Sequence, residues 1–179
     1  MYTEVHPFEP LLPPEPRMEP LLAKAHDLSR AATLLAGTRV PPELRTLLRS
    51  MNSYYTNRIE GQHTRPHEID LALRQDLSKD ALLAARQRLA LAHIEAEQAL
   101  EQRYSGAAGA TALYSVDAVQ DIHRALFGHL PVADPVTPEK DPITPGVLRQ
   151  RDVQVGQHVA LAHASVPLFL ARWSAFYGA

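Results

Sequence analysis

The chain has 179 residues, a formal net charge of −2 and no cysteine, which suits one soluble domain and excludes disulfides, thiolate metal sites and cysteine nucleophiles. The near-neutral charge is not that of a general nucleic-acid binder. No run of 18 apolar residues occurs and residues 1–20 lack the features of a signal peptide, so we expect a cytoplasmic protein without a membrane span.

The first 20 residues are rich in proline, and we expect an extended arm there. A helix is predicted from residue 21 to 36, because apolar side chains recur at three- and four-residue steps and Gly37 follows as a C-terminal cap. Its stripe consists of Leu21, Leu22, Ala25, Leu28, Ala32 and Leu35.

A second helix is predicted over residues 42–61, because Pro41 and Pro42 suit a first helical turn and Gly61 suits a helix end. A short third helix is predicted after Pro66. The apolar stripe of the second helix is Leu44, Leu47, Leu48, Met51, Tyr55 and Ile59.

The longest helical run is predicted from Ser78, as N-cap, to about Tyr104. Residues 105–112 are small and contain glycine, and they read as a connector. Ser115 is expected to cap a further helix. The inward-facing side chains are predicted to be Leu82, Leu89, Ala92, Ala96 and Leu100 in the first of these helices, and Val119, Ile122, Leu126 and Phe127 in the second.

Residues 130–145 contain five prolines and no helical period, which predicts a long loop. Apolar and polar residues then alternate over 153–159, and Gly156-Gln157 suits a tight turn, so a small β-hairpin is predicted near residues 148–161. A final helix is expected from Val166-Pro167. The expected class is all-α with one small β-hairpin.

The most informative segment is residues 53–61, with the sequence S-Y-Y-T-N-R-I-E-G. Glu60 is expected to end a helix, where a carboxylate meets the negative end of the helix dipole at a cost of roughly 0.3–1 kcal/mol compared with a cation. Local stability does not require an acid there. A solvated glutamate that tolerates a small penalty is the structural alternative.

The pattern Thr56-x-x-x-Glu60-Gly61 resembles the inhibitory motif of Fic-family proteins: a Ser or Thr, three residues, a Glu, then Gly or Asn. Two further stretches resemble the family and occur in its order. Residues 121–127 are similar to its I-H-x-x-L-F helix. The flap hairpin of the family is matched by Gly146-Val147-Leu148-Arg149, then Val153 to His158, then Val166-Pro167.

The resemblance spans roughly residues 45–177 and implies a partial Fic-like helical bundle. It divides the chain into residues 1–40, a proline-rich arm with an N-terminal helix, and residues 41–179, the N-terminal part of a Fic domain. The inhibitory helix would occupy about 42–61, and the flap about 148–161.

Fic enzymes transfer AMP from ATP to a hydroxyl of a target protein, with a catalytic loop H-P-F-x-D/E-G-N-G-R that supplies a base, a Mg²⁺ ligand and a phosphate cradle. These 179 residues do not contain that loop, since His6-Pro7-Phe8 is not followed by G-N-G-R. The resemblance therefore implies the regulatory and target-docking portion of a self-inhibited adenylyltransferase. It implies no catalytic residue in this chain, with ATP and Mg²⁺ bound by the full-length parent and not by this portion.

Two groups of site residues are implied by the resemblance. The inhibitory glutamate of the family pairs with an arginine that otherwise holds the γ-phosphate of ATP. The flap pairs its strand edge with an extended segment of the target. The inhibitory group is Thr56, Glu60 and Gly61, and the docking flap is Val153, Val155 and Gly156.

Two interpretations stay open, because small antitoxins of the Fic system carry the same glutamate motif on a separate chain. The alternative is thus a non-enzymatic helical interaction module or antitoxin-like inhibitor, although the hairpin and the helices after Ser78 favour the enzyme portion. Expected partners are a target protein, through the flap, and a second copy in a homo-oligomer, but neither nucleic acid nor membrane. No metal site is expected, because Pro66 interrupts His63 and His67 and no H-E-x-x-H occurs.

Overall fold

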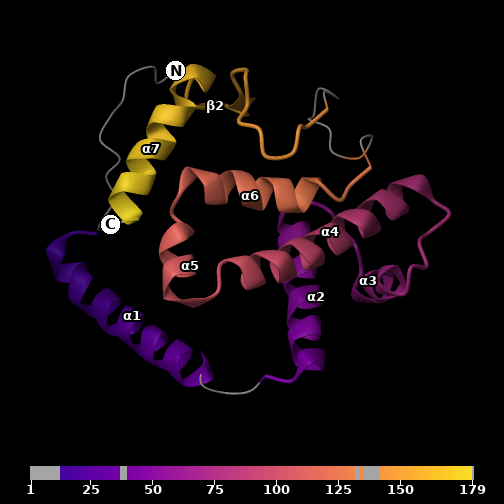
Figure 1. Cartoon of the computed structure of the whole chain (residues 1–179), viewed down its shortest axis with the longest axis horizontal. Coiled ribbons are helices and arrows are strands. Elements are labelled where there is room, and N and C mark those ends of the chain that lie inside the picture. Colours follow the sequence, from indigo (N-terminus) through magenta and orange to yellow (C-terminus); the bar gives the residue numbers. More distant parts are fainter. Residues whose placement is uncertain (1–12, 37–39, 132–133, 135–141, 179) are drawn as a thin grey trace. The chain divides into compact units, whose positions relative to one another are not determined.

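The computed structural model describes residues 13–36, 40–131, 134 and 142–178. Helices make up most of these residues and one two-stranded antiparallel sheet is present, which confirms a mostly helical chain with a small β-hairpin (Figure 1). The chain divides into two compact units between Thr46 and Leu47.

Helix α1 spans Glu15–Ala36, so the prediction of an extended arm up to residue 20 is wrong for its last six residues. Pro16 lies in the first helical turn, where its missing N–H has no intrahelical acceptor to lose. Pro20 lies farther inside α1 and does not end it. Residues 1–12 of the predicted arm lie outside the described residues.

Helix α2 spans Pro42–Ile59 and ends close to the predicted boundary. Its buried residues are polar: the Ser53 hydroxyl donates to the carbonyl of Ala90 at 3.0 Å, and the Asn57 amide donates to the Ser53 oxygen at 3.2 Å. The apolar stripe predicted on α2 is exposed instead. Small hydrogen-bonded side chains therefore mark the face that α2 turns toward the core.

Helices α3 (Pro66–Leu73) and α4 (Ala81–Arg103) pack against each other. The N-cap of α4 is Asp80, whose carboxylate accepts from the Leu83 N–H at 2.8 Å, and not Ser78 as predicted. Ser78 instead donates its N–H to the side chain of Gln87 at 2.7 Å. The same Gln87 donates to the carbonyl of Glu68 at 2.8 Å, so one buried amide joins α3, α4 and the segment between them.

The core around α4 is built from small residues. A cluster of Ile69, Ala90 and Ile94 packs with Tyr54 from α2. The predicted inward face of α4 was wrong at Leu82, which is exposed. Alanines permit close approach of neighbouring helices, so they, and not the larger leucines, occupy the contact positions. The buried alanines of α4 are Ala84, Ala90, Ala92 and Ala96.

Residues predicted as a connector form helix α5 (Gly106–Ala112), in which four of the seven residues are alanine, the strongest helix former. Helix α6 (Val116–Phe127) begins as predicted, with the Ser115 hydroxyl accepting from the Ala118 N–H at 3.1 Å. It packs against α4 (Figure 1). Ala118 is buried in α6, whereas Ile122, expected to face inward, is exposed.

Strands β1 (Gln154–Val155) and β2 (His158–Val159) form the predicted hairpin, which is shorter than residues 148–161. A 3₁₀ turn, η1 (His163–Ser165), leads into α7 (Val166–Tyr177), which packs against α6. In the part of the chain that the structure describes, no helix has both the length and the apolar character needed to cross a bilayer.

Candidate functional site

The end of α2 is a Schellman cap. The Gln62 N–H donates to the carbonyl of Asn57 at 2.7 Å, and the Gly61 N–H donates to the carbonyl of Arg58 at 3.1 Å. Gly61 has a φ of +76°, which the left-handed position of this cap requires. The glycine of the Thr56-to-Gly61 motif therefore has a structural role, which places Glu60 at the C-cap.

Glu60 and Thr56 lie one helical turn apart and are both exposed. The Glu60 N–H donates to the carbonyl of Thr56 at 3.3 Å. The Glu60 carboxylate makes no hydrogen bond or ion pair with any residue that the structure describes. An acid at the negative end of a helix is mildly unfavourable, and nothing described here offsets it.

The arginine inside the motif has another partner. Arg58 donates to the Tyr54 hydroxyl at 3.0 Å, one turn back along α2. Tyr54 itself packs on the core cluster. The structure thus separates the cation of the motif from its acid and leaves Glu60 available to a group outside the described residues.

The predicted flap residues lie in the hairpin. Val155 belongs to β1 and is 69% exposed. Val153 precedes β1, and its carbonyl accepts from the Ala160 N–H at 3.0 Å, which continues the pairing by one step. Gly156 has a φ of +59° and comes first in a two-residue turn, a position that takes glycine in type II′ turns. Pairing leaves the outer edge of each strand available for another strand.

The base of the hairpin is closed by side chains to which the sequence assigned no role. Arg149 donates to the carbonyl of Arg151 at 2.7 Å and also to the carbonyl of Leu161. The Asp152 carboxylate accepts from the backbone N–H of His163 at 2.8 Å, and this bond is the main reason that the pKa of Asp152 lies below its usual value. An anchored base with an exposed tip is the result.

The segment before the hairpin is fastened to α6. The Gly146 N–H donates to His123 Nδ1 at 2.8 Å, and Gln120 donates to the carbonyl of Gly146 at 2.9 Å. Burial lowers the pKa of His123, in agreement with an unprotonated Nδ1 that accepts a hydrogen bond. This contact between His123 and Gly146 was not predicted from the sequence. Gly146 and the I-H-x-x-L-F pattern were both recognised, but only the fold brings them together.

An ionic cluster joins the end of α4 to α6. Asp121 accepts from the Tyr104 hydroxyl at 2.9 Å, pairs with Arg103 at 2.7 Å, and pairs with Arg124. The Tyr104 hydrogen bond is the largest cause of the lowered pKa of Asp121, and the two arginines act in the same direction. The acid that precedes the I-H pattern therefore holds two helices together.

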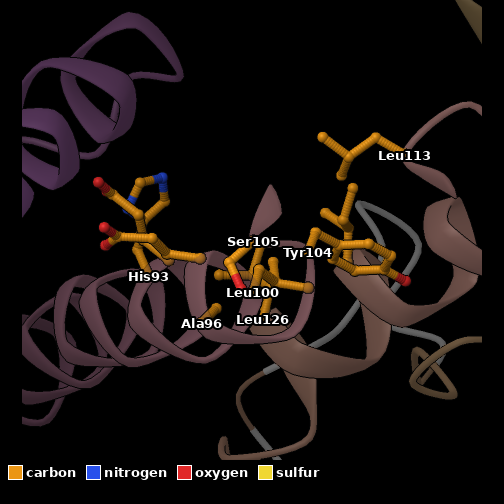
Figure 2. A pocket seen from close by; sticks show the side chains of 10 residues that line it. His93, Ala96, Leu100, Tyr104, Ser105, Leu113 and Leu126 are labelled. Atoms are coloured by element: carbon orange, nitrogen blue, oxygen red, sulfur yellow. The ribbon is translucent and has the colours of Figure 1, made fainter. Parts of the chain in front are cut away.

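An open groove of about 630 Å³ lies among α4, α5 and α6. Figure 2 shows His93 at one end and Tyr104 with Leu113 toward the other. Its floor is mainly apolar, and His93 Nδ1 is buried with no hydrogen-bond partner among the residues that the structure describes. Such a groove can accept an apolar side chain or ligand.

The residues at the end of α2 do not by themselves fit a nucleotide with its metal ion. Glu60 is an anion, which repels phosphate groups, and Thr56 supplies only a hydroxyl. Among the residues whose positions are described, no three His, Asp or Glu side chains gather as metal ligands do. The structure places the inhibitory group and the flap group on separate elements, the first at the end of α2 and the second in the hairpin.

Comparison of the chain with family models, with curated proteins and with solved structures gives no match.

Proposed function

We propose that this chain is the regulatory and target-docking portion of a Fic-family protein adenylyltransferase. The observation that carries the proposal is Glu60, an exposed carboxylate that has no partner among the described residues and sits where the helix dipole disfavours it. Because no described residue pairs with the Glu60 carboxylate, this carboxylate is available to bind a cation from outside the described residues. The family resemblance implies an arginine there, since a guanidinium binds a carboxylate or a phosphate bidentately and the two compete.

The hairpin supports the docking part of the proposal. Its base is fastened by Arg149 and Asp152, whereas its tip and strand edges are exposed. An extended target segment can add to such an edge through main-chain hydrogen bonds, which requires little specificity in the target sequence.

The exposed Glu60 carboxylate also supports the antitoxin-like alternative. In that case the arginine that pairs with Glu60 belongs to a separate polypeptide, and the chain inhibits without catalysing. The hairpin is then a structural element or a contact surface.

The test measures transfer of labelled AMP from ATP by the full-length gene product. Glu60→Gln retains the size of the side chain and removes its charge. Loss of a charge-assisted contact is on the order of 1.5–3 kcal/mol, so we expect the transfer rate to rise about tenfold or more. Glu95→Gln, on the exposed surface of α4, is the matched control and should leave the rate unchanged.

Equal rates for wild type and Glu60→Gln, with both proteins folded, would show that Glu60 is not inhibitory. The alternative predicts a different pattern. The wild-type chain would then suppress a separately supplied Fic enzyme, Glu60→Gln would not, and no transfer would accompany the chain itself.

A further inference from the structure

Helix α1 has a regular apolar seam along its length. Its apolar side chains recur at alternating steps of three and four residues, which is the heptad pattern of a coiled coil. The leucines occupy one core position of each heptad, and Met or Ala occupies the other. The seam consists of Met18, Leu21, Ala25, Leu28, Ala32 and Leu35.

The central part of this seam is exposed. Leu21 is 53% exposed and Leu28 is 70% exposed, and the alanines between them are exposed too. Most of the stability of a helix in a protein comes from burial of its apolar face. Covering the exposed leucines removes apolar area from water, so a partner on the seam stabilises α1.

We propose that the α1 seam is a homodimer interface in which α1 of a second copy packs antiparallel against it. A two-fold axis between His26 and Asp27 sets Leu21 opposite Ala32 of the second copy, and Ala25 opposite its Leu28. Every central layer then pairs a large side chain with a small one, which lets the backbones approach closely and fills the seam without voids. A parallel pair would instead set alanine against alanine and leave gaps.

The charges beside the seam agree with this arrangement. Lys24 flanks the seam and stands level with Ser29 and near Ala31 of the second copy, so no like charges face each other. Pro20 lies away from the seam and does not obstruct it. The seam from Met18 to Leu35 is about 25 Å long and buries on the order of 1,000 Å² in total, near the lower size of a specific interface.

The chain offers a matched pair of leucines for the test. Leu28 lies in the middle of the seam and Leu34 lies outside it, and both are 70% exposed. Sedimentation of the full 179-residue chain over a range of concentrations should show a dimer for wild type and for Leu34→Lys. For Leu28→Lys we expect the dissociation constant to rise about 100-fold or more, because the pair would bury two lysines at its centre.

A cross-linking experiment reports on direction and does not depend on the lysine variant. The chain has no cysteine, so Leu21→Cys and Ala32→Cys each introduce one thiol. Residues 21 and 32 face each other in the antiparallel pair, whereas each residue lies about 16 Å along the helix axis from the same residue of the second copy. With a short bis-maleimide, an antiparallel pair gives a much higher yield of cross-linked dimer from a mixture of the two variants than from either variant alone. Stronger linkage within each single variant would indicate a parallel pair and overturn the proposal. A monomeric wild type would also overturn it, since the seam would then be covered by the same chain.

Discussion

At the scale of single residues, Glu60 and Gly61 show how one short motif divides between structure and function. Gly61 is explained by its positive φ in the Schellman cap, whereas nothing in the described contacts requires Glu60. Gly146 differs from both: it is buried, has a φ of +78°, and lies against the guanidinium of Arg124. A functional role is thus proposed only for the residue that local structure leaves unexplained.

Gly146→Ala should destabilise the chain by about 1–2 kcal/mol, the cost of a left-handed conformation in a residue with a Cβ. The loss should exceed that of Gly61→Ala. The Cβ at residue 61 meets nothing within 4 Å, whereas at residue 146 it lies 2.8 Å from Arg124 Nη2. Arg124 would have to move from its pairing with Asp121.

Urea unfolding of both variants provides the measurement, with the midpoint compared at an unchanged slope. An equal loss for the two glycines would mean that Arg124 adjusts without cost. A stable Gly146→Ala would contradict the backbone argument itself.

His123 should make stability depend on pH. Burial lowers the pKa of His123 in the folded chain, whereas the unfolded chain takes up the proton near pH 6.5. The unfolded state therefore binds more protons below that pH, so this contribution is complete above about pH 6.5 and is lost as the pH falls toward the folded value. Protonation also removes the acceptor for the Gly146 N–H.

The measurement compares the free energy of unfolding at pH 7.5 and at pH 5.5 for wild type and for His123→Asn. The asparagine oxygen can accept from Gly146 at the place of Nδ1 but does not titrate. The variant should lose less stability than wild type on acidification. An identical pH dependence would show that titration of His123 does not contribute to it.

At the scale of elements, the hairpin illustrates how two short strands hold their shape. A two-stranded hairpin is marginal by itself, and here its ends are held by Arg149 and by Asp152 with His163. The side chains that hold the hairpin lie at its base, and the residues of its tip are exposed.

Arg149→Ala should open the hairpin without unfolding the helices. It removes hydrogen bonds from a charged donor to two carbonyls, and we expect amide exchange in residues 154–159 to rise about tenfold or more. Gln150→Ala, at the exposed neighbouring position, is the control. Hydrogen–deuterium exchange followed by mass spectrometry measures the amide exchange of this segment in both variants. Unchanged protection in Arg149→Ala would show that Asp152 and His163 suffice.

At the scale of the whole molecule, the chain combines a compact unit over residues 47–179 with a separate unit over residues 9–46. The larger unit has its own core around α3, α4 and α6 and carries both Glu60 and the hairpin. The smaller unit carries the α1 seam, whose central leucines are exposed. The proposed dimer contact of α1 and the proposed regulatory role of Glu60 therefore rest on different units and can be tested independently.

The sequence by itself determined the helices whose apolar steps, caps and prolines agree. The ends of α2, the start of α6 after Ser115, the start of α7 at Val166 and the hairpin with Gly156 in its turn follow from such local signals. Local rules succeed there because capping, turn geometry and proline act over a few neighbouring residues. The candidate residues Thr56, Glu60 and Gly61 were likewise identified from a contiguous motif.

Only the tertiary structure decided which faces are buried and which distant residues meet. The predicted inward face of α4 is buried at Ala92 and Ala96 but exposed at Leu82, because helix packing selects small side chains where helices approach closely and periodicity alone does not distinguish them from leucines. The contact between His123 and Gly146 joins residues 23 positions apart, and the hydrogen bond from Arg149 to Leu161 joins residues 12 positions apart. Such contacts depend on the path of the chain between them, which no local pattern encodes.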